Sequence, residues 1–563
     1  MRKQLHSSLF FLCLCVLGAG LPACHPDDND PKGQAGDLSD PVRRTHALER
    51  LQSIFGTRLS EAKGDRNSPG VKEFNDATVE TLTKTYLEHP EDLGNGETSL
   101  RLMSEMRDPR ALPALIKALD WKVEMTENQA QTAAQTLGNI DIPADKKGEV
   151  IEGLSKALLR IDGARGIDNR LRIAFLQELG KLKDKRCVDA LTKIALKRDA
   201  SQNFLINRIA ATQLVGIADP SSVPTFIQGL YWFDANNPAM RMNDIATSGL
   251  VAIGKPSLAP LLKVLRGEDE TANTVVKDYI AAIKQKDPEA ARKFDPRSLV
   301  AIEASYSLGK LGYRDAIAPL IEESKSADKM RATAAAIALV SVVRTNEDTA
   351  KIVEALIRVY GALDPMEQPQ LLVAIRHLYA ADALPFLLNV ATGAKGKGKD
   401  KEKPSSTARM YAFQSYALLA NKAEIAPLKA LFDKESLFKE NLSDHAPLLA
   451  VTATCDANVE CWTGKLKNKD KLMLRKSASM LARFGRGDEK AIHALVDLFG
   501  HRDLEVRNEA LGAVDAMAVT GSREAVKKIT DLESAEAGRA IWEGFQREAL
   551  PARSRLQLRG GTS

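Results

Sequence analysis

The chain has 563 residues, of which 44% are hydrophobic, 27% are charged and only 5% are aromatic. Alanine and leucine are abundant, and no region alternates apolar and polar residues with period two, so we expect an all-α protein. A chain of this length usually forms several domains, unless its core grows along one axis as it does in repeat proteins. The net charge is +5, near neutral for this length, which argues against general nucleic-acid binding.

Residues 1–23 have the pattern of a signal peptide. Arg2 and Lys3 form a positive start, and the apolar run 9–20 is too short to span a bilayer as a mature helix. The following residues, Leu21-Pro22-Ala23-Cys24, resemble the bacterial lipobox, in which a small residue precedes a cysteine that is lipidated and starts the mature chain. An ordinary secretory signal followed by a chance cysteine is the alternative. Cleavage removes two bases and no acid, so the charge falls from +5 to +3.

This resemblance implies that Cys24 carries a lipid that anchors the protein at the cell envelope. His25 follows it in place of Asp, which by the sorting pattern of Gram-negative lipoproteins implies the periplasmic face of the outer membrane, if the organism has two membranes. Residues 25–41 are rich in Asp, Pro and Gly, with Leu38 as the only large apolar residue. We therefore predict a disordered tether over 24–45.

The two ends of the chain after residue 45 lack the helical repeat that fills the residues between them. Within 46–107 the predicted helices fit no repeat, and one apolar face combines Leu48, Leu51 and Phe55. The last predicted helix, within 535–563, is rich in charge. Atypical end segments close the open ends of a repeat array, so we predict an N-terminal helical cap over 46–107 and a C-terminal capping helix and tail over 535–563.

Residues 491–517 are the clearest copy of a unit that recurs through most of the chain. Ile492, Leu495 and Phe499 share one face of a helix, Asp503 is placed to cap a second helix, and Val506 begins that helix's apolar face. A single pair of such helices cannot bury both apolar faces, so pairs stack on each other. The unit, with Val506-Arg507 and Ala510-Leu511-Gly512 in its second helix, resembles the HEAT repeat, a family of α-solenoids that bind other macromolecules.

Two markers recur with compatible spacing over 108–534. A proline lies in the first turn of the first helix, where its missing N–H costs nothing, at Pro113, Pro224, Pro260, Pro319, Pro385 and Pro427. An arginine lies early in the second helix, at Arg172, Arg208, Arg241, Arg331, Arg409, Arg475 and Arg507. We expect an α-α superhelix of roughly twelve helical hairpins. The resemblance implies that the arginines pair with the turn aspartate of their own or the adjacent unit, and a positive stripe for an acidic partner is the alternative.

Two insertions interrupt the period. Residues 268–297 contain an additional helical stretch, and residues 393–406 are dominated by lysine and glycine without an apolar anchor. We predict that 393–406 is a solvated loop. Its lysines are candidates for binding anionic lipid headgroups, lipopolysaccharide or an acidic protein, with plain solubilisation as the alternative: Lys395, Lys397, Lys399, Lys401 and Lys403.

Aromatic residues end the first helix of two repeats. Trp121 and Trp232 each lie eight residues after the marker proline, and Tyr231 and Phe233 flank the second. Such residues are enriched at interface hot spots, so all four are candidate partner-binding residues. Filling the gap between adjacent repeats is an equally weighted alternative.

Three cysteines follow Cys24. Cys455 and Cys461 span a predicted helix–turn–helix junction, where two helix ends come within disulfide range, and an exported protein meets oxidising conditions. We predict a disulfide between them, with two free thiols as the alternative. Cys187 lies in an apolar helical pattern and is predicted to be a small core residue.

No catalytic motif is present in the sequence. No histidine is followed by glutamate, which sets the chain apart from HEAT-like metal hydroxylases, and P-loops, G-x-S-x-G elbows, Cys-x-x-Cys sites and dinucleotide fingerprints are all missing. We expect no enzyme, no cofactor and no metal. The sequence favours a monomeric scaffold that binds a protein partner. A structural envelope spacer is one alternative, and a cofactor-handling enzyme such as the HEAT-like bilin lyases is another.

Overall fold

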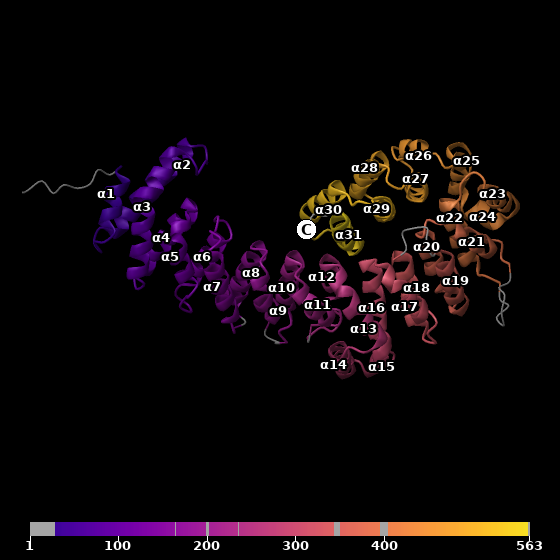
Figure 1. Cartoon of the computed structure of the whole chain (residues 1–563), viewed down its shortest axis with the longest axis horizontal. Helices are drawn as coiled ribbons and strands as arrows, with labels where there is room; N and C mark the ends of the chain where they lie inside the picture. The colour runs from indigo at the N-terminus through magenta and orange to yellow at the C-terminus, as the bar shows by residue number, and fades with distance from the viewer. Residues whose placement is uncertain are drawn as a thin grey trace, which may run out of the picture. The chain divides into compact units, whose positions relative to one another are not determined.

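The computed structural model describes residues 29–163, 165–198, 202–234, 236–342, 349–394 and 403–560 (Figure 1). Within these ranges the regular structure is helical, and the only β-type contact is an isolated bridge between Phe233 and Arg241. The all-α prediction is confirmed. The chain divides into two compact units, Met1–Ala190 and Leu191–Ser563, which are treated separately below.

The first unit begins with single helices and continues as helical hairpins. Successive helices pack against each other, and α4 packs on α6, which in turn packs on α8. The helices are α1 (Pro31–Asp37), α2 (Arg44–Glu61), α3 (Pro69–Glu88), α4 (Leu93–Met106), α5 (Leu112–Ala118), α6 (Glu127–Leu137), α7 (Lys147–Leu159) and α8 (Gly166–Lys181).

The start of the chain departs from the expected tether. Residues 29–45 include the helix α1, whose first turn is capped by Asp30 through the backbone N–H groups of Lys32 and Gly33. Leu38 is fully buried, and the Nε of Arg44 donates to its carbonyl at 2.8 Å. The N-cap, the buried leucine and Arg44, which also pairs with Asp92 at 3.0 Å, order this segment. Residues 24–28 lie outside the described part of the chain.

The second unit continues the hairpins up to the C-terminus. Its helices are α9 (Val188–Ala195), α10 (Phe204–Ile217), α11 (Val223–Gly229), α12 (Asn243–Ile253), α13 (Leu258–Arg266), α14 (Glu270–Lys286), α15 (Pro288–Ala291), α16 (Pro296–Leu311), α17 (Ile317–Glu323), α18 (Lys329–Val342), α19 (Thr349–Ala362), α20 (Gln368–Arg376), α21 (Leu384–Ala391), α22 (Ser406–Leu419), α23 (Ile425–Lys434), α24 (Ser436–Asn441), α25 (Ala446–Cys455), α26 (Val459–Lys465), α27 (Lys471–Phe484), α28 (Glu489–Asp497), α29 (Leu504–Met517), α30 (Arg523–Ala535) and α31 (Ala540–Arg559).

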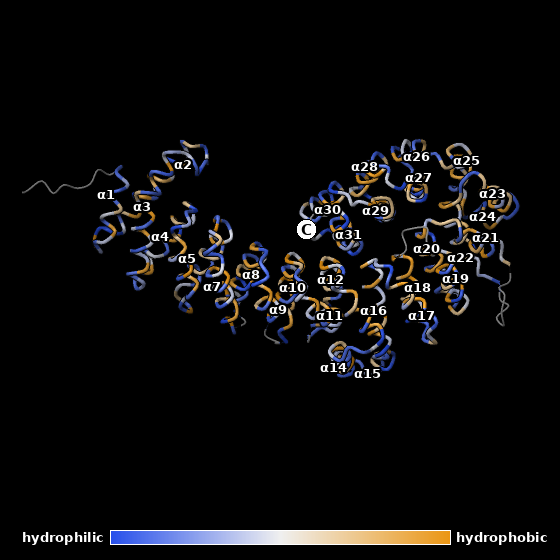
Figure 2. Tube along the Cα trace, viewed as in Figure 1, coloured by the Kyte–Doolittle hydropathy of each residue, from blue (hydrophilic) through white to orange (hydrophobic). Residues whose placement is uncertain are grey.

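Apolar residues recur along each helix at the helical period, as the hydropathy colouring shows (Figure 2). In the unit at 491–517, Leu495, Phe499, Ala510 and Val514 are fully buried, as the spacing predicts. Burying one such large side chain contributes about 1.5–3 kcal/mol. Each helix buries apolar side chains against the other helix of its hairpin and against the next hairpin. This stacking is typical of an α-solenoid.

The second helices of the hairpins form a continuous layer in the second unit. Each packs on the next, in the order α10, α12, α16, α18, α20, α22, α27, α29 and α31. The insertion α14–α15 lies between α13 and α16, and three short helices, α23 to α25, interrupt the hairpin pattern between α22 and α27. The last helix, α31, packs on α29 and α30 and also on α12 and α16. The layer therefore closes into a ring, with α31 beside α12 (Figure 1).

Candidate functional site

The turn aspartates of the repeats cap the second helices. Asp503 accepts hydrogen bonds from the backbone N–H groups of Glu505 and Val506, at 2.9 and 3.2 Å. Asp470 caps α27 in the same way. Because these carboxylates satisfy N–H groups that lack a partner within the helix, they fix where each second helix begins.

The repeated arginines form a ladder, but they pair with carboxylates other than the turn aspartates. Four of them reach a carboxylate of the following unit: Arg208 to Asp244, Arg241 to Glu303, Arg475 to Glu505 and Arg507 to Glu536. The expected pairing with the turn aspartate is corrected here: the turn aspartates cap the second helices, and these arginines reach other carboxylates. Several arginines also donate to carbonyls at the end of the first helix, as Arg241 does to Leu230. The ladder thus ties helix ends within and between repeats.

A buried polar cluster joins α20 to α29 across the ring. An Nη of Arg376 donates to Glu509 at 2.6 Å, and the Oγ of Ser479 donates to the same carboxylate at 2.9 Å. The side chains of Glu509 and Arg376 are 1% and 5% exposed. Burial raises the pKa of Glu509, but Arg376 and His377 outweigh it and hold the pKa well below the ordinary glutamate value. Glu509 is therefore a buried anion.

A buried lysine lies at the end of α22. The Nζ of Lys476 is fully buried and donates to the carbonyls of Ala417 at 2.9 Å and Ala420 at 2.6 Å. Arg483 donates to the Leu419 carbonyl at 2.8 Å. These carbonyls are the groups that a helix C-terminus leaves unpaired, and positive charge is favourable there. Burial lowers the pKa of Lys476 well below its usual value.

Trp121 is buried at a repeat junction of the first unit. Its side chain is 7% exposed, it packs on Phe175 with ring centroids 5.7 Å apart, and the guanidinium of Arg160 lies 3.9 Å above its ring. Arg160 also donates to the Trp121 carbonyl at 2.9 Å. The ring fills space between two hairpins, and the exposed apolar residues of this turn are Val123 and Met125.

The three aromatic residues at 231–233 are buried between helices. Tyr231, Trp232 and Phe233 are 2%, 7% and 4% exposed. The Tyr231 hydroxyl donates to the Val300 carbonyl at 2.8 Å, and Phe233 packs on Tyr279 of α14 with centroids 5.1 Å apart. The helix α14 was predicted from the sequence, but its contact with Phe233 joins segments that are separate in the chain.

Other predicted site residues fall at the margin of the described structure or beyond it. Cys24, Lys395, Lys397, Lys399 and Lys401 lie outside the described residues. Lys403 is described and exposed, two residues before the helix α22 is capped by Ser405.

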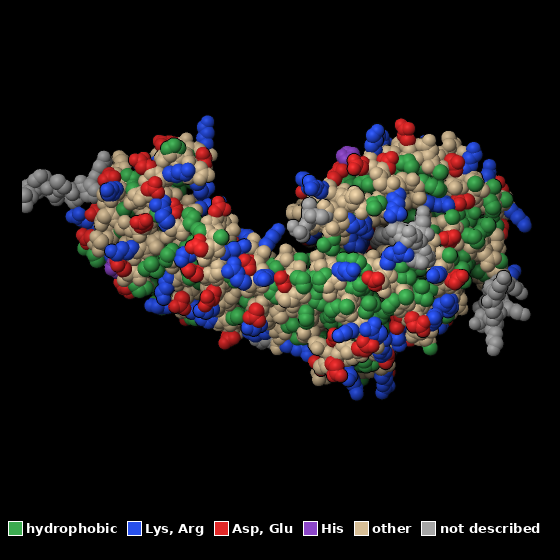
Figure 3. Space-filling view, viewed as in Figure 1, with side chains coloured by type: hydrophobic (Ala, Val, Ile, Leu, Met, Phe, Trp, Pro, Cys, Tyr) green, Lys and Arg blue, Asp and Glu red, His purple; other side chains and the backbone are tan. Residues whose placement is uncertain are grey.

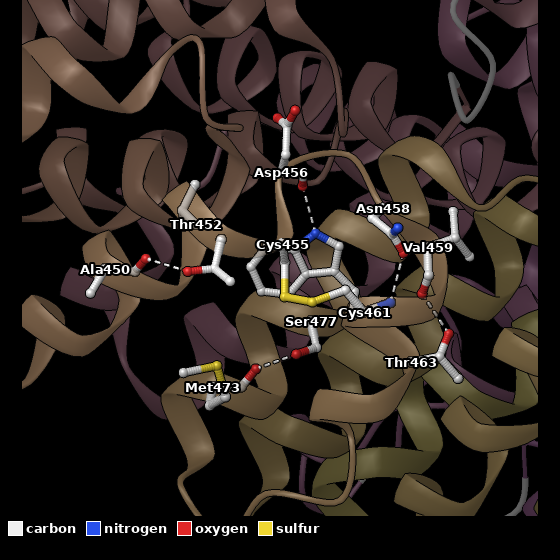
Figure 4. The surroundings of a disulfide bond; sticks show 12 residues. Ala450, Thr452, Cys455, Asp456, Asn458, Val459, Cys461, Thr463, Met473 and Ser477 are labelled. Atoms are coloured by element: carbon white, nitrogen blue, oxygen red, sulfur yellow. Dashed lines mark hydrogen bonds between the residues drawn. A yellow bond between two sulfur atoms is a disulfide. The ribbon is translucent and has the colours of Figure 1, made fainter.

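Cys455 and Cys461 are joined by a disulfide between the end of α25 and the start of α26 (Figure 4). Their Cα atoms are 5.4 Å apart, which is an ordinary distance for a disulfide. The turn is held further by the Asn458 side chain, which accepts from the Cys461 N–H at 2.8 Å, and by the Trp462 indole, which donates to the Asp456 carbonyl at 2.7 Å. Cys187 is a free, buried thiol, and burial raises its pKa to about 11.

The described residues contain no group of three or more His, Cys, Asp or Glu side chains placed to hold a metal ion. No helix among them is both long enough and apolar enough to cross a bilayer. A shallow surface depression in the first unit lies between α3 and α5 and has Leu87, Arg110 and Pro113 among its lining residues. It brings together neither a nucleophile with a base nor a set of metal ligands, so no reaction is derived from it.

No protein-family model matches the chain, and no curated protein matches it either. Solved structures do resemble it. The karyopherin Kap121p bound to the SUMO protease Ulp1p matches over 95% of this chain and 74% of that one, at 13% identity and a TM-score of 0.38. Kap121p bound to Nup53p matches over 90% and 57%, at 12% identity and a TM-score of 0.34. The myosin chaperone UNC-45 from C. elegans matches over 96% and 76%, at 15% identity and a TM-score of 0.22. At these scores no property of those proteins is transferred to this chain.

Proposed function

We propose that this protein is a lipid-anchored scaffold that binds a protein partner at the bacterial cell envelope, on the periplasmic face of the outer membrane where the organism has two membranes. The observation that carries the proposal is the combination of an export-type leader ending at Cys24 with a disulfide between Cys455 and Cys461. Structural disulfides persist in oxidising compartments and are rare in reducing ones. The leader and the disulfide therefore both favour a location on the exported, oxidising side of the membrane.

The fold supports the scaffold part of the proposal. Stacked hairpins present a long surface, and the ion pairs that join successive repeats keep that surface in a defined shape. An N-terminal lipid would hold this surface near the membrane and raise its effective concentration toward membrane-bound partners. Bacterial lipoproteins carry more than one acyl chain, which makes such anchoring persistent.

Fractionation of cells that express Cys24→Ala tests the anchor. We expect the variant to move from the membrane fraction to the soluble fraction, while Cys15→Ala, a matched change inside the leader, stays with the membranes. Retention of Cys24→Ala on membranes would show that the lipobox interpretation is wrong.

Crosslinking in cells, followed by purification from solubilised membranes, tests the scaffold. A scaffold returns a stoichiometric protein partner. Repeated recovery of the chain alone would favour a structural spacer that has no tight ligand.

A further inference from the structure

The last helix, α31, has two halves that are held by different forces. Its first half carries Trp542 and Phe545, which are 4% and 0% exposed, and the Phe545 ring lies 6.0 Å from that of Phe499. Pro551 then interrupts the backbone hydrogen bonding inside the helix. Residues 548–559, which we call the closing segment, complete the ring.

The closing segment combines ion pairs with a smaller apolar contact. Glu548 pairs with Lys310 of α16, and Arg555 donates both to the Lys310 carbonyl and to Asp515 of α29, with its Nε 3.1 Å from that carboxylate. Arg559 pairs with the same carboxylate at 3.0 Å. The apolar contact of the segment comes from Ala549, Ala552 and Leu556, which are buried in the core, whereas Leu558 remains 41% exposed.

The two halves should differ in how readily they detach. Detaching the first half exposes two large aromatic side chains to water, which costs their full transfer free energy. Detaching the closing segment exposes only one leucine and two alanine side chains of the core. It also returns arginine and carboxylate groups to water, and their hydration offsets much of the ion-pair attraction that is lost. The Arg376–Glu509 pair keeps α29 in place independently of this segment. The closing segment can therefore leave without opening the rest of the ring.

We propose that the surface of α12, α16 and α29 under the closing segment is a helix-binding site, which the chain itself occupies until a partner helix displaces it. This inference rests on the proposed scaffold function and names the surface that the partner uses. The resident segment also defines the chemistry of the partner: an amphipathic basic helix whose arginine reaches Asp515 and whose leucine lies on Gly254. A side chain at Gly254 would meet Leu558 at 3.2 Å, so the glycine makes room for that leucine. Docking of an amphipathic helix into a groove is a common mode of recognition.

The surface beside the closing segment is suited to a longer helix. Hydrophobic side chains gather over α12, α16 and α18 next to α31 (Figure 3). Tyr306 of α16, one turn before Lys310, is 38% exposed. A partner helix that replaced the closing segment could cover this side chain as well, and would gain contact area that the resident segment does not use.

A labelled peptide with the sequence of residues 548–560, EALPARSRLQLRG, tests the site on the full chain by fluorescence anisotropy. Arg555→Ala in the chain removes the contacts with Asp515 and with the Lys310 carbonyl, which weakens the resident segment and vacates the site. We expect this variant to bind the peptide at least about ten-fold more tightly than the wild type, because the apparent affinity follows the fraction of open sites. Glu543→Gln, an exposed change in the first half of α31, should leave peptide binding at the wild-type level. A peptide with alanine at both positions of Arg555 and Arg559 should bind at least ten-fold more weakly.

Hydrogen exchange on the unmodified full chain provides the second measurement. We expect residues 552–559 to exchange at least about ten-fold faster than residues 541–547, because only the closing segment opens locally. Uniform exchange along α31, or equal peptide affinity for the wild type and Arg555→Ala, would overturn the proposal. Arg559→Ala replaces Arg555→Ala if the latter misfolds. Neither measurement needs the lipid or the envelope partner, so a negative result here leaves the proposed function standing.

Discussion

The carboxylate of Glu509 in α29 accepts a 2.6 Å hydrogen bond from Arg376 of α20, although 133 positions separate the two residues in the chain. Both side chains are buried, so the pair is shielded from the solvent screening that weakens surface ion pairs. It links two second helices that are not consecutive in the layer. This contact gives the ring a cross-link in addition to the stacking of adjacent repeats.

Removing one partner of this pair should destabilise the second unit strongly. We expect Glu509→Ala to lower the free energy of unfolding by about 3–5 kcal/mol, because it leaves the Arg376 guanidinium buried without its carboxylate. Glu505→Ala is the matched control in the same helix, since Glu505 is 65% exposed and its pair with Arg475 should contribute about 0–1 kcal/mol. Urea unfolding followed by circular dichroism measures both. Equal losses for the two variants would contradict a dominant role of the buried pair.

The Glu509 carboxylate should make the free energy of unfolding decrease at acid pH. The pKa of Glu509 is lowered on folding, so the stabilisation is fully present above the ordinary glutamate value of 4.5 and is lost as the pH falls toward the lowered value. We expect the wild type to lose more stability than Glu509→Gln between about pH 6 and pH 3. Thermal melting across this range compares the two slopes. Parallel slopes would assign the acid sensitivity to other carboxylates.

Local periodicity made most of the fold predictable from the sequence, whereas the polar contacts were not predictable. The spacing of Ile492, Leu495 and Phe499 indicates a helix, because it places the three side chains on one helical face. Nothing near Arg376 in the sequence indicates Glu509, and nothing near Lys476 indicates the carbonyls of α22. Contacts of this kind depend on the curvature of the solenoid, which accumulates over many repeats.

Distant contacts also matter at the two chain ends. The segment at 29–45 has the composition of a disordered tether, yet burial of Leu38 and the pair between Arg44 and Asp92 order it. The helix α31 was predicted as a cap from its charge and position. Its role in closing the ring depends on Lys310 and Asp515, which are distant in the sequence. A partner that is distant in the chain leaves no periodic signal in a single sequence.

The disulfide should make a moderate contribution to stability. Closing a loop of this length restricts the unfolded chain by about 2 kcal/mol. We expect Cys461→Ser to cost about that amount and Cys455→Ser to cost more, because Cys455 is 1% exposed and a hydroxyl would be buried in its place. Mass spectrometry under non-reducing conditions should recover the two cysteines in one linked peptide. Cys187 is the internal control, since its thiol should react with an alkylating reagent only after unfolding.

The lysine-rich insertion should be dispensable for folding. The helices α21 and α22 on either side pack against each other directly, and Ser405 caps α22 with its own side chain. We expect deletion of residues 395–402 to leave the helical content and the melting temperature nearly unchanged. Circular dichroism of the deletion variant measures both. A large fall in either would show that the loop is part of the structure, and loss of binding to anionic vesicles without such a fall would support the lipid-contact hypothesis.

The packing role of Trp121 can be tested separately from partner binding, because Trp121 is buried whereas Val123 and Met125 in the same turn are exposed. We expect Trp121→Ala to lower the free energy of unfolding of the first unit by about 3–5 kcal/mol through the cavity it leaves. Trp121→Phe should cost less, because it keeps most of the ring and removes an indole N–H that has no acceptor among the described residues. Val123 and Met125 are 62% and 57% exposed, so the double serine variant should change stability by no more than about 0.5 kcal/mol per site. If the turn binds a partner, this serine variant loses crosslinked partner while its melting temperature is retained. Loss of partner by Trp121→Phe at unchanged stability would instead assign the contact to the indole itself.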